Sequence, residues 1–296
     1  MKKISYNIQK IIYCPNCCGE LKEHEKHFLC SKCELIYKYT SNGQLDLRLQ
    51  KTKKISCPIE LGDSIKVPKI RLLRMKPNPE VSFAGIETPH HLSSEILSYF
   101  PKAFKKNSLV LDLGCGDAIH REVCEHAGFY YVGVDYSQPK APILADGHSL
   151  PFKDESFEFV LSIAVLEHIQ HPLVFCREVC RVLKPGGVFI GSIAFMEPFH
   201  ETSYYHHTHL GVANSLLSGG LSISLITVIK NWNGLKAILR MGMFPGIPRL
   251  ITELISWPIL MASRFWWRVA RHFKAKATCE NEITKTAGSY FFVARK

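Results

Sequence analysis

Long apolar runs are absent from this sequence of 296 residues, and acidic residues are scarce. Because no stretch of about 18 apolar residues occurs, we expect no membrane-spanning helix. The first ten residues are basic and then polar, without the apolar core of a secretory signal, so a cytoplasmic location is expected. Only 26 Asp and Glu residues oppose 37 Lys and Arg residues, and the net charge of +11 favours an anionic partner. RNA, phospholipid head groups and an acidic substrate all remain open.

Cysteines are concentrated near the amino terminus. Cys14 and Cys17 form one C-x-x-C pair and Cys30 and Cys33 form a second, with twelve residues between the pairs. Tetrahedral zinc needs four converging soft ligands, and two pairs joined by a hairpin supply them. The sequence therefore predicts a structural Zn²⁺ site at these four cysteines. The neighbouring residues expected to lie on the loop surface, without binding the metal, are Cys18, His24 and His27.

The amino-terminal module is too small to fold without help. About forty residues bury little apolar surface, so zinc would supply folding free energy. Ile12–Leu47 resembles the zinc-ribbon activator proteins that partner tRNA, rRNA and protein methyltransferases. The resemblance depends on the cysteine pairs and on Tyr37–Gly43, where Tyr-Lys-Tyr replaces the family's Tyr-Pro-Ile. We predict a zinc ribbon over residues 1–49 and a linker over residues 50–87.

An α/β pattern begins near residue 88. The apolar strand Leu109–Leu113 ends in the turn Gly114–Asp117, and a helix is expected over Ala118–His126. A second strand, Tyr130–Val134, ends in Asp135. Glycines at a strand-to-helix turn let the backbone approach a ligand closely, and an acid ending the next strand can accept hydrogen bonds from ribose hydroxyls. This pattern predicts a nucleotide site at the carboxyl ends of parallel strands.

Further segments resemble class I S-adenosylmethionine (SAM)-dependent methyltransferases, especially the branch related to ubiquinone and menaquinone methyltransferases. The matching segments are Leu111–Asp117, Val132–Asp135, Ala145–Phe152, Phe157–Val165, Leu166–Ile169 and Arg181–Gly187. The resemblance covers residues 109–195 continuously. It implies an α/β fold, a Rossmann-like sheet of seven strands that binds SAM, within a domain over residues 88–296. It leaves the acceptor open.

The same resemblance implies roles for individual residues. Gly114 and Gly116 would contact SAM through their backbone, and Asp112 would orient its methionine end. Asp135 would hold the ribose. The other residues expected at the cofactor are Asp146, Gly147 and His148 beside the adenine, and Ile163 and Ala164 along the pocket.

Histidines and tyrosines are candidates for the acceptor side of the site. His168 follows the fourth strand and could be the general base, since imidazole titrates near neutral pH, or it could anchor the turn. A segment rich in His and Tyr follows the fifth strand, and its residues expected to line the acceptor pocket are Tyr204, Tyr205, His206 and His207. A metal site at Glu201, His207 and His209 and a plain polar loop are the alternatives.

The carboxyl-terminal region departs from a minimal methyltransferase. Leu221–Ile229 is expected as the sixth strand and Ser289–Ala294 as an antiparallel seventh, with an apolar helical insertion over about residues 231–285 between them. The helix-like stretches are Leu235–Met241, Pro248–Ser256 and Pro258–Phe273. Tryptophans beside arginines fit an anionic membrane surface, whereas a lid, a dimer surface and an RNA contact stay open.

The predicted function is SAM-dependent methylation of a small or lipid-like acceptor at oxygen, carbon or nitrogen. An rRNA or tRNA methyltransferase is the first alternative. The Asn/Asp-Pro-Pro-Tyr/Phe signature of many amino-directed base methyltransferases is lacking, because Ser162–Val165 occupies its place. This leaves methylation of a guanine ring nitrogen open. A non-catalytic interaction protein with a SAM-type fold is the second alternative.

Overall fold

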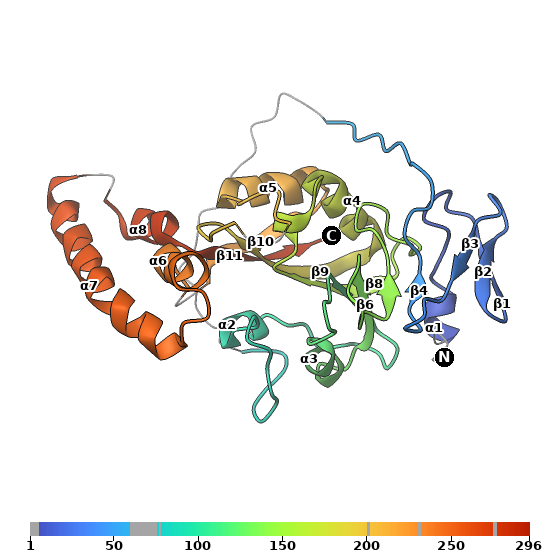
Figure 1. The fold of residues 1–296 in the computed structure, drawn as a ribbon, viewed down its shortest axis with the longest axis horizontal. Coiled ribbons are helices and arrows are strands. Elements are labelled where there is room, and N and C mark those ends of the chain that lie inside the picture. Colours follow the sequence, from blue (N-terminus) through green and yellow to red (C-terminus); the bar gives the residue numbers. More distant parts are fainter. Residues whose placement is uncertain (1–5, 60–75, 77, 200–201, 230–231, 275–276) are drawn as a thin grey trace.

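The computed structural model describes the chain except for residues 1–5, 60–75, 77, 200–201, 230–231 and 275–276. Figure 1 shows a central twisted sheet with helices on both faces, a small β-rich module at one end and a long helix at the other. Among the described helices, none has the length and apolar character needed to cross a membrane.

The central sheet has eight strands in the described part of the chain. In spatial order they are β10 (Ser222–Val228), β11 (Ser289–Arg295), β9 (Leu183–Ala194), β8 (Phe157–Ile163), β5 (Leu109–Leu113), β6 (Tyr130–Asp135), β7 (Ile143–Leu144) and β4 (Leu45–Asp46). β11 pairs antiparallel with both β10 and β9, and the other neighbours are parallel. Seven strands form the predicted Rossmann-like sheet, which is confirmed, and the amino-terminal region adds β4 as an eighth.

Helices cover both faces of the sheet, which explains why β5 is buried along its whole length. α4 (Pro172–Val182) and α5 (His209–Ser218) cover one face, and α2 (Ser94–Leu97) and α3 (Arg121–His126) cover the other (Figure 1). Each face therefore has its own apolar cluster. α3 begins three residues later than predicted, because Ala118 has a left-handed backbone (φ 60°) that a helix cannot include.

The amino-terminal module packs against the central sheet and adds a strand to it. It contains α1 (Tyr6–Gln9) and the antiparallel strands β1 (Leu21–His24), β2 (His27–Cys30) and β3 (Ile36–Lys38). Its last strand, β4, pairs in parallel with β7, and its apolar side chains belong to the same cluster as those of α4. The division into residues 1–49, 50–87 and 88–296 stays a prediction, since much of residues 50–87 lies outside the described chain.

The region between β10 and β11 is helical. It contains α6 (Gly234–Ala237), the π-helical turn η2 (Ile238–Met243), α7 (Arg249–Phe273) and α8 (Cys279–Thr286). The sequence predicted a break before Pro258, but α7 is a single helix of 25 residues. Proline removes one hydrogen bond, here to the carbonyl of Leu254. That turn is exposed, so water can replace the lost bond.

Candidate functional site

The turn after β5 leaves one glycine enclosed and one open. Gly114 (φ 78°) packs against Val165, and a Cβ atom there would overlap that side chain. Gly116 (φ 53°) has no atom within 4 Å of the position a Cβ would take. Its amide donates a hydrogen bond to Asp135 Oδ2 at 3.1 Å. Gly116 therefore has open space beside its backbone, whereas Gly114 is enclosed in the turn, and a contact of either residue with SAM stays a prediction.

Asp135 ends β6 with a carboxylate held by backbone amides. Besides Gly116, the amides of Ser137 and Gln138 donate to Asp135 Oδ1 at 3.1 and 3.2 Å. The residue is only partly buried. A fixed, accessible carboxylate beside an open glycine backbone offers the acceptors and the space that a nucleoside ribose requires. These residues fit the adenosyl part of SAM.

Asp112 lies beneath the turn in a closed polar cluster. Its carboxylate is fully buried and accepts a hydrogen bond from the hydroxyl of Tyr131 at 2.6 Å. His120 Nδ1 lies 3.1 Å from the same Oδ2 atom. Burial and the neighbouring Asp112 raise the pKa of Tyr131 well above its ordinary value, so the phenol stays a donor. No sequence pattern indicated His120 or Tyr131 as partners of Asp112, and any contact of Asp112 with the methionine end of SAM stays a prediction.

The segment predicted beside the adenine is stabilised internally. The amide and Nδ1 of His148 lie 2.8 and 2.7 Å from Asp146 Oδ1, and His148 Nε2 accepts from the His171 amide at 3.1 Å. Burial tends to raise the pKa of Asp146, but the hydrogen bonds from His148 lower it overall. A Cβ atom at Gly147 would lie 2.8 Å from the Phe175 ring, so glycine lets the loop lie against α4.

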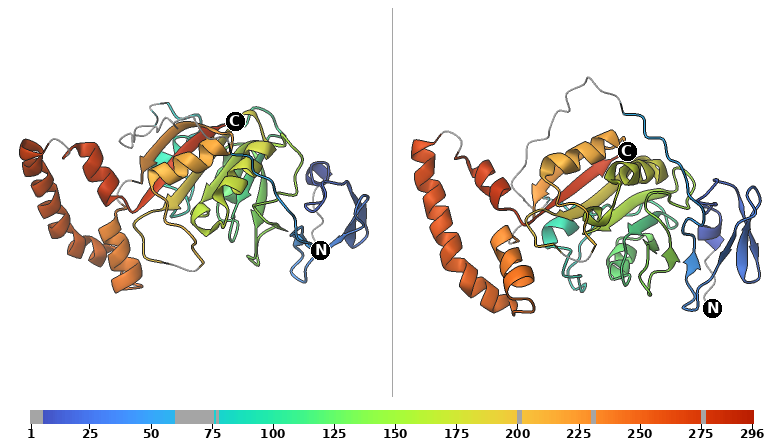
Figure 2. Two further views of the ribbon diagram at one scale, coloured as in Figure 1. Left: turned by 90° about the horizontal axis from the view of Figure 1, so that it is seen from above. Right: turned by 45° about the horizontal axis from the view of Figure 1, so that its top comes forward.

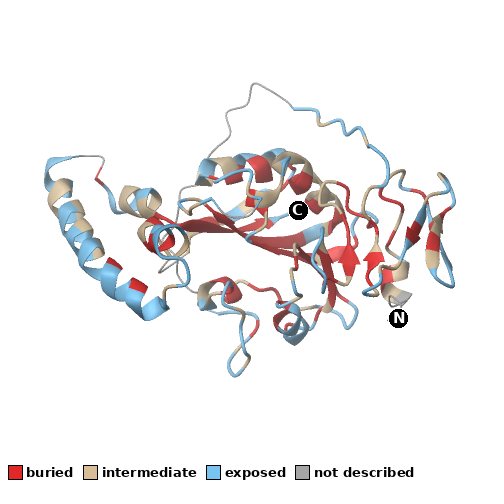
Figure 3. Cartoon of the chain, in the orientation of Figure 1, coloured by how far each residue is buried: buried red, intermediate tan, exposed pale blue. Residues whose placement is uncertain are grey.

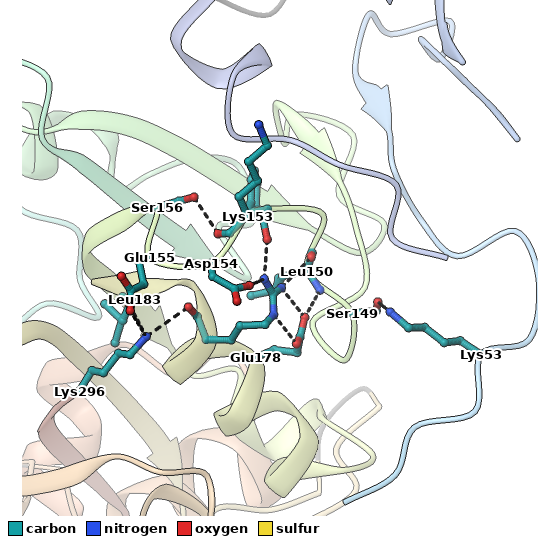
Figure 4. Close-up of polar contacts among 12 residues, drawn as sticks. Lys53, Ser149, Leu150, Lys153, Asp154, Glu155, Ser156, Glu178, Leu183 and Lys296 are labelled. Carbon is teal, nitrogen blue, oxygen red and sulfur yellow. Dashed lines mark hydrogen bonds and ion pairs between the residues drawn. The ribbon is translucent and has the colours of Figure 1, made fainter. Parts of the chain in front are cut away.

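Side chains of α4 hold the end of this segment (Figure 4). The amide of Leu150 donates to Glu178 Oε2 at 2.7 Å, and Arg181 Nη2 donates to the Leu150 carbonyl at 3.0 Å. Arg181 also pairs with Glu178 and Asp154. Because both polar groups of the Leu150 backbone are bonded to α4, the loop has a defined position relative to the helix.

The turn after β8 carries the candidate base. Ile163 is buried, and the next residue, Ala164, is exposed with φ 55°, a strained conformation for a residue with a Cβ atom. The Ala164 amide is held by the carbonyl and the hydroxyl of Ser192 at 3.1 and 3.2 Å. A short 3₁₀ turn, η1 (Leu166–His168), follows. His168 ends it as a half-buried residue, and its role as base stays a prediction.

The segment after β9 returns to η1. The amides of Tyr204 and Tyr205 donate to the carbonyl of Glu167 at 2.7 and 3.2 Å. Glu167 is buried, and its Oε1 accepts from the Ala194 amide at 3.3 Å. The two tyrosines therefore lie next to the turn that carries His168. Sequence reasoning missed Glu167, whose burial no pattern revealed.

The histidines of this segment differ in environment. His206 is exposed, whereas His207 is buried and its Nε2 lies 3.4 Å from the Leu166 carbonyl. Burial lowers the pKa of His207, which favours the neutral ring. The alternative metal site included Glu201, which lies outside the described residues. Within the described chain, neither His207 nor His209 belongs to a group of three potential ligands.

The four predicted cysteine ligands converge. Their sulfur atoms all lie within 4.8 Å of one another, with Cys14 Sγ 3.6 Å from Cys33 Sγ and Cys17 Sγ 3.4 Å from Cys30 Sγ. Thiolates bound tetrahedrally at about 2.3 Å from zinc are separated by roughly 3.8 Å. The amides of Lys32 and Cys33 donate to Cys30 Sγ. The donor set and its spacing fit Zn²⁺.

The amino-terminal module directly contacts the segment that is predicted to lie beside the adenine. Ser149 Oγ donates to the Pro15 carbonyl at 2.9 Å, between Cys14 and Cys17. Lys53 Nζ bonds the same carbonyl and Ser149 Oγ, each at 2.8 Å (Figure 4). Sequence spacing could not reveal this link, because it joins residues more than 130 positions apart.

Comparison with known proteins identifies the central part of the chain. Residues 111–191 match the family model described as a methyltransferase domain. This part of the chain is a methyltransferase domain. It runs from β5 into β9 and includes the glycine turn, Asp135, the adenine segment and η1. The match agrees with the predicted enzyme class, a methyltransferase.

Relatives of the methyltransferase domain are named as methyltransferases, but only some of the names give a substrate. An uncharacterized methyltransferase of Mycolicibacterium gilvum is 32% identical over 118 residues, which are 34% of this chain and 46% of the relative. A probable tRNA methyltransferase 9B of Homo sapiens is 33% identical over 105 residues, 31% of this chain and 23% of the relative. The chain thus spans less than half the length of these curated relatives.

Solved structures show similarity at lower identity. One is from the complex between the Haloferax volcanii Trm112 methyltransferase activator and a methyltransferase, with 19% identity and a TM-score of 0.45, covering 69% of this chain and 88% of that one. An S-adenosylmethionine-dependent methyltransferase from Mesorhizobium loti has 16% identity and a TM-score of 0.42, covering 68% and 95%.

Proposed function

We propose that this protein transfers a methyl group from SAM to an apolar small-molecule or lipid-like acceptor. The observation that carries the proposal is the arrangement at the carboxyl edge of the sheet. Gly116 and Asp135 offer a nucleoside site at the ends of β5 and β6, and η1 follows β8 on the same edge. SAM supplies a methyl group already activated by a sulfonium. The chain then has to align the acceptor and exclude water.

Exposed apolar and aromatic side chains occur in the segments after β9 and η2. Met196 and Phe199 follow the end of β9 and are exposed, and Tyr204 and Tyr205 are exposed beside η1. Phe244, which follows η2, is exposed as well. An apolar acceptor would gain free energy by burying these surfaces, about 25 cal/mol per Å². A strongly charged acceptor would gain little from them.

His168 is the proposed base where the acceptor is a hydroxyl. His168 is the last residue of η1. In the same turn, the carbonyl of Glu167 accepts hydrogen bonds from the amides of Tyr204 and Tyr205. Removing a general base typically lowers the rate about 10²- to 10⁴-fold. We expect His168→Gln to lower kcat to this extent while the affinity for SAM stays unchanged. Equal kcat values in the two proteins would assign His168 a structural role.

The proposed role of Zn²⁺ is structural. Four cysteine ligands leave no coordination position for a substrate, which is the pattern of closed structural sites. Binding would fasten the hairpin of β1 and β2 to the Cys14–Cys17 turn. Metal analysis of the purified protein should find one zinc per chain.

Calorimetric titration with SAM tests the cofactor site. Asp135→Asn removes a charged acceptor for the ribose, and we expect its Kd for SAM to rise about 10- to 100-fold. Asp117→Asn is the matched control, since Asp117 lies in the same turn but its carboxylate pairs outward with Lys140. A folded, zinc-loaded protein with no affinity for SAM would refute the proposed function.

An RNA acceptor is the second candidate. It is favoured by the net charge of +11 and by the name of the human relative, a probable tRNA methyltransferase. Incubation with methyl-labelled SAM and separate lipid and RNA extracts distinguishes the candidates. Label recovered in the lipid fraction supports the proposal, and label confined to RNA replaces it. Cofactor binding without transfer to either would favour the non-catalytic alternative.

A further inference from the structure

The long helix α7 presents an apolar surface that no other described part of the chain covers. Thr252 and Ser256 are buried, and α7 contacts α6, but most residues of α7 with large apolar side chains are exposed (Figure 3). We call these residues the α7 apolar surface: Leu250, Ile251, Leu254, Ile255, Trp257, Ile259, Met261, Phe265, Trp266 and Phe273. Leu254 and Phe265 each keep 66% of their surface exposed, so intramolecular packing does not explain them.

The α7 apolar surface covers a wider arc around the helix axis than the apolar stripe of a helix packed on a protein core. At 100° per residue its side chains span an arc of roughly 200°. A helix that packs on a protein core presents an apolar stripe about 100° wide. A single neighbouring helix would therefore cover only about half of the surface. A broad apolar arc beside a charged face is typical of a helix that lies in the plane of a lipid interface.

The borders of the arc carry the residues that a membrane interface favours. Trp257 lies at one border and Trp266 within about 20° of the other, while Leu254 and Phe265 lie between them. Tryptophan is enriched where the head groups meet the acyl chains. The two tryptophans would thus mark the depth to which the helix enters a bilayer.

Positive charge accompanies Trp257. Arg264 and Arg268 are exposed on the same side of α7, one turn apart, and neither forms an ion pair with another described residue. The only acid of α7, Glu253, is paired with Lys236. Two uncompensated guanidinium groups next to an apolar arc complement an anionic surface, because arginine binds lipid phosphates with two parallel hydrogen bonds.

We propose that α7 docks this protein on an anionic lipid bilayer. The α7 apolar surface enters the boundary between head groups and acyl chains, and Arg264 and Arg268 contact the phosphates. A second copy of the chain would leave part of the arc exposed, and RNA would meet Leu, Ile and Met side chains that form no hydrogen bonds. The docking does not depend on methyl transfer, so it can be tested separately.

The position of α7 relates the proposed membrane contact to the proposed acceptor site. Ser289, the first residue of β11, pairs with Ala194, the last residue of β9. The carboxyl edge of β9 therefore faces the region of α6 and α8, from which α7 projects (Figure 1). A bilayer bound to α7 would lie on the side of the molecule where the proposed acceptor enters.

Flotation of the full-length, zinc-loaded protein with vesicles tests the proposal. One vesicle preparation is phosphatidylcholine alone, and the other is an equal mixture of phosphatidylcholine and phosphatidylglycerol. We expect flotation with the mixed vesicles, weakened by salt, and little with phosphatidylcholine alone. A blue shift of tryptophan fluorescence should accompany binding.

Two sets of variants identify the contacts. Leu254→Glu with Phe265→Glu should lower partitioning at least tenfold, since each side chain loses its apolar burial. Arg264→Glu with Arg268→Glu should lower it at least about fivefold, and only for the anionic vesicles. The matched controls are Phe104→Glu, which changes an exposed apolar residue outside α7, and Lys105→Glu with Lys106→Glu, which changes two exposed lysines next to it in the sequence. Both controls should bind as the parent does, and all variants should keep the parent Tm.

Three outcomes would overturn the proposal. The first is the absence of flotation with either vesicle. The second is a dimer in light scattering that Leu254→Glu converts to a monomer, without vesicle binding, which would assign the surface to self-association. The third is retention of RNA that Arg264→Glu with Arg268→Glu abolishes while vesicle binding is absent.

Discussion

Two additions flank the methyltransferase domain, and they differ in how far their apolar residues are buried. The amino-terminal module and α7 lie at opposite ends of the molecule (Figure 2). In the module, Tyr37, Leu45 and Leu47 have no exposed surface. In α7, Leu254 and Trp257 keep about two thirds of theirs, 66% and 65%.

The difference lies in where each addition finds its partners. The module uses a cluster of four cysteines and pairs β4 with β7, so its side chains are buried within the same chain. α7 contacts the body through one narrow face that includes Thr252 and Ser256. Burial inside the chain contributes to folding, whereas an uncovered apolar surface contributes only when something binds to it. Changes in the module should therefore affect stability, and changes in α7 should affect association.

Removal of zinc should have the largest effect. Binding of a structural zinc is worth about 10–16 kcal/mol, so a strong chelator, or Cys30→Ser, should unfold the module. Because Pro15 is bonded to Ser149, the affinity for SAM should fall as well. Cys18→Ser is the control, since Cys18 is exposed and outside the cluster. Circular dichroism and SAM titration measure the two effects, and an unchanged Tm after complete zinc removal would contradict the structural role.

A matched pair of leucines compares the two regions directly. Leu47→Ala deletes a side chain with no exposed surface and should cost about 2–5 kcal/mol of unfolding free energy. Leu254→Ala removes the same atoms from the exposed α7 and should change it by less than about 0.5 kcal/mol. Urea denaturation followed by circular dichroism gives both values. Equal losses would mean that α7 is packed within the protein in solution.

The contact between the module and the domain also has a polar component. Gln44 is buried, and its Nε2 donates to the carbonyls of Gln138 and Ala141, each at 2.8 Å. Gln44→Ala leaves both carbonyls without this donor and should cost about 1–3 kcal/mol. Gln50→Ala is the control, because Gln50 is exposed and its side chain donates to the Ile36 carbonyl of the module and not to the domain. A loss equal to that of the control would show that water replaces Gln44.

The sequence predicted those features that depend on neighbours along the chain. Strand β5 has the predicted bounds, because Leu109–Leu113 is apolar apart from Asp112 and lies between a polar Asn-Ser pair and Gly114. Gly116 and Asp135 meet as predicted, since parallel neighbours align their carboxyl ends. The cysteine pairs converge, because a short hairpin is the only connection between them.

Features that depend on distant packing could not be predicted. The pairing of β4 with β7 joins two strands of two residues each, and neither has a pattern of its own. Asp112 lies in β5, but its partners His120 and Tyr131 come from other parts of the chain. Their distances from Asp112 along the sequence match no known motif. The continuity of α7 through Pro258 depends on solvent exposure, which the sequence alone does not give.

The smallest predicted effect is a loss of stability at acidic pH that arises from a carboxylate of the amino-terminal module. Hydrogen bonds from Arg48 lower the pKa of Asp46 in β4, although burial opposes them. A carboxyl whose pKa is lower in the folded state stabilises the protein above its unfolded pKa of about 3.9, and this contribution is lost as pH falls through the folded value.

Asp46→Asn should therefore lower stability near neutral pH by up to about 1 kcal/mol, the range of partly exposed ion pairs. It should also make the decline in stability below pH 5 shallower than in the parent. Urea midpoints measured at several pH values give this slope. Glu25→Gln, which removes the same charge from the exposed hairpin between β1 and β2, is the control. Parallel slopes for Asp46→Asn and the parent would show that the Asp46–Arg48 pair does not contribute to the stability of the protein. The acid response would then have to come from another part of the chain.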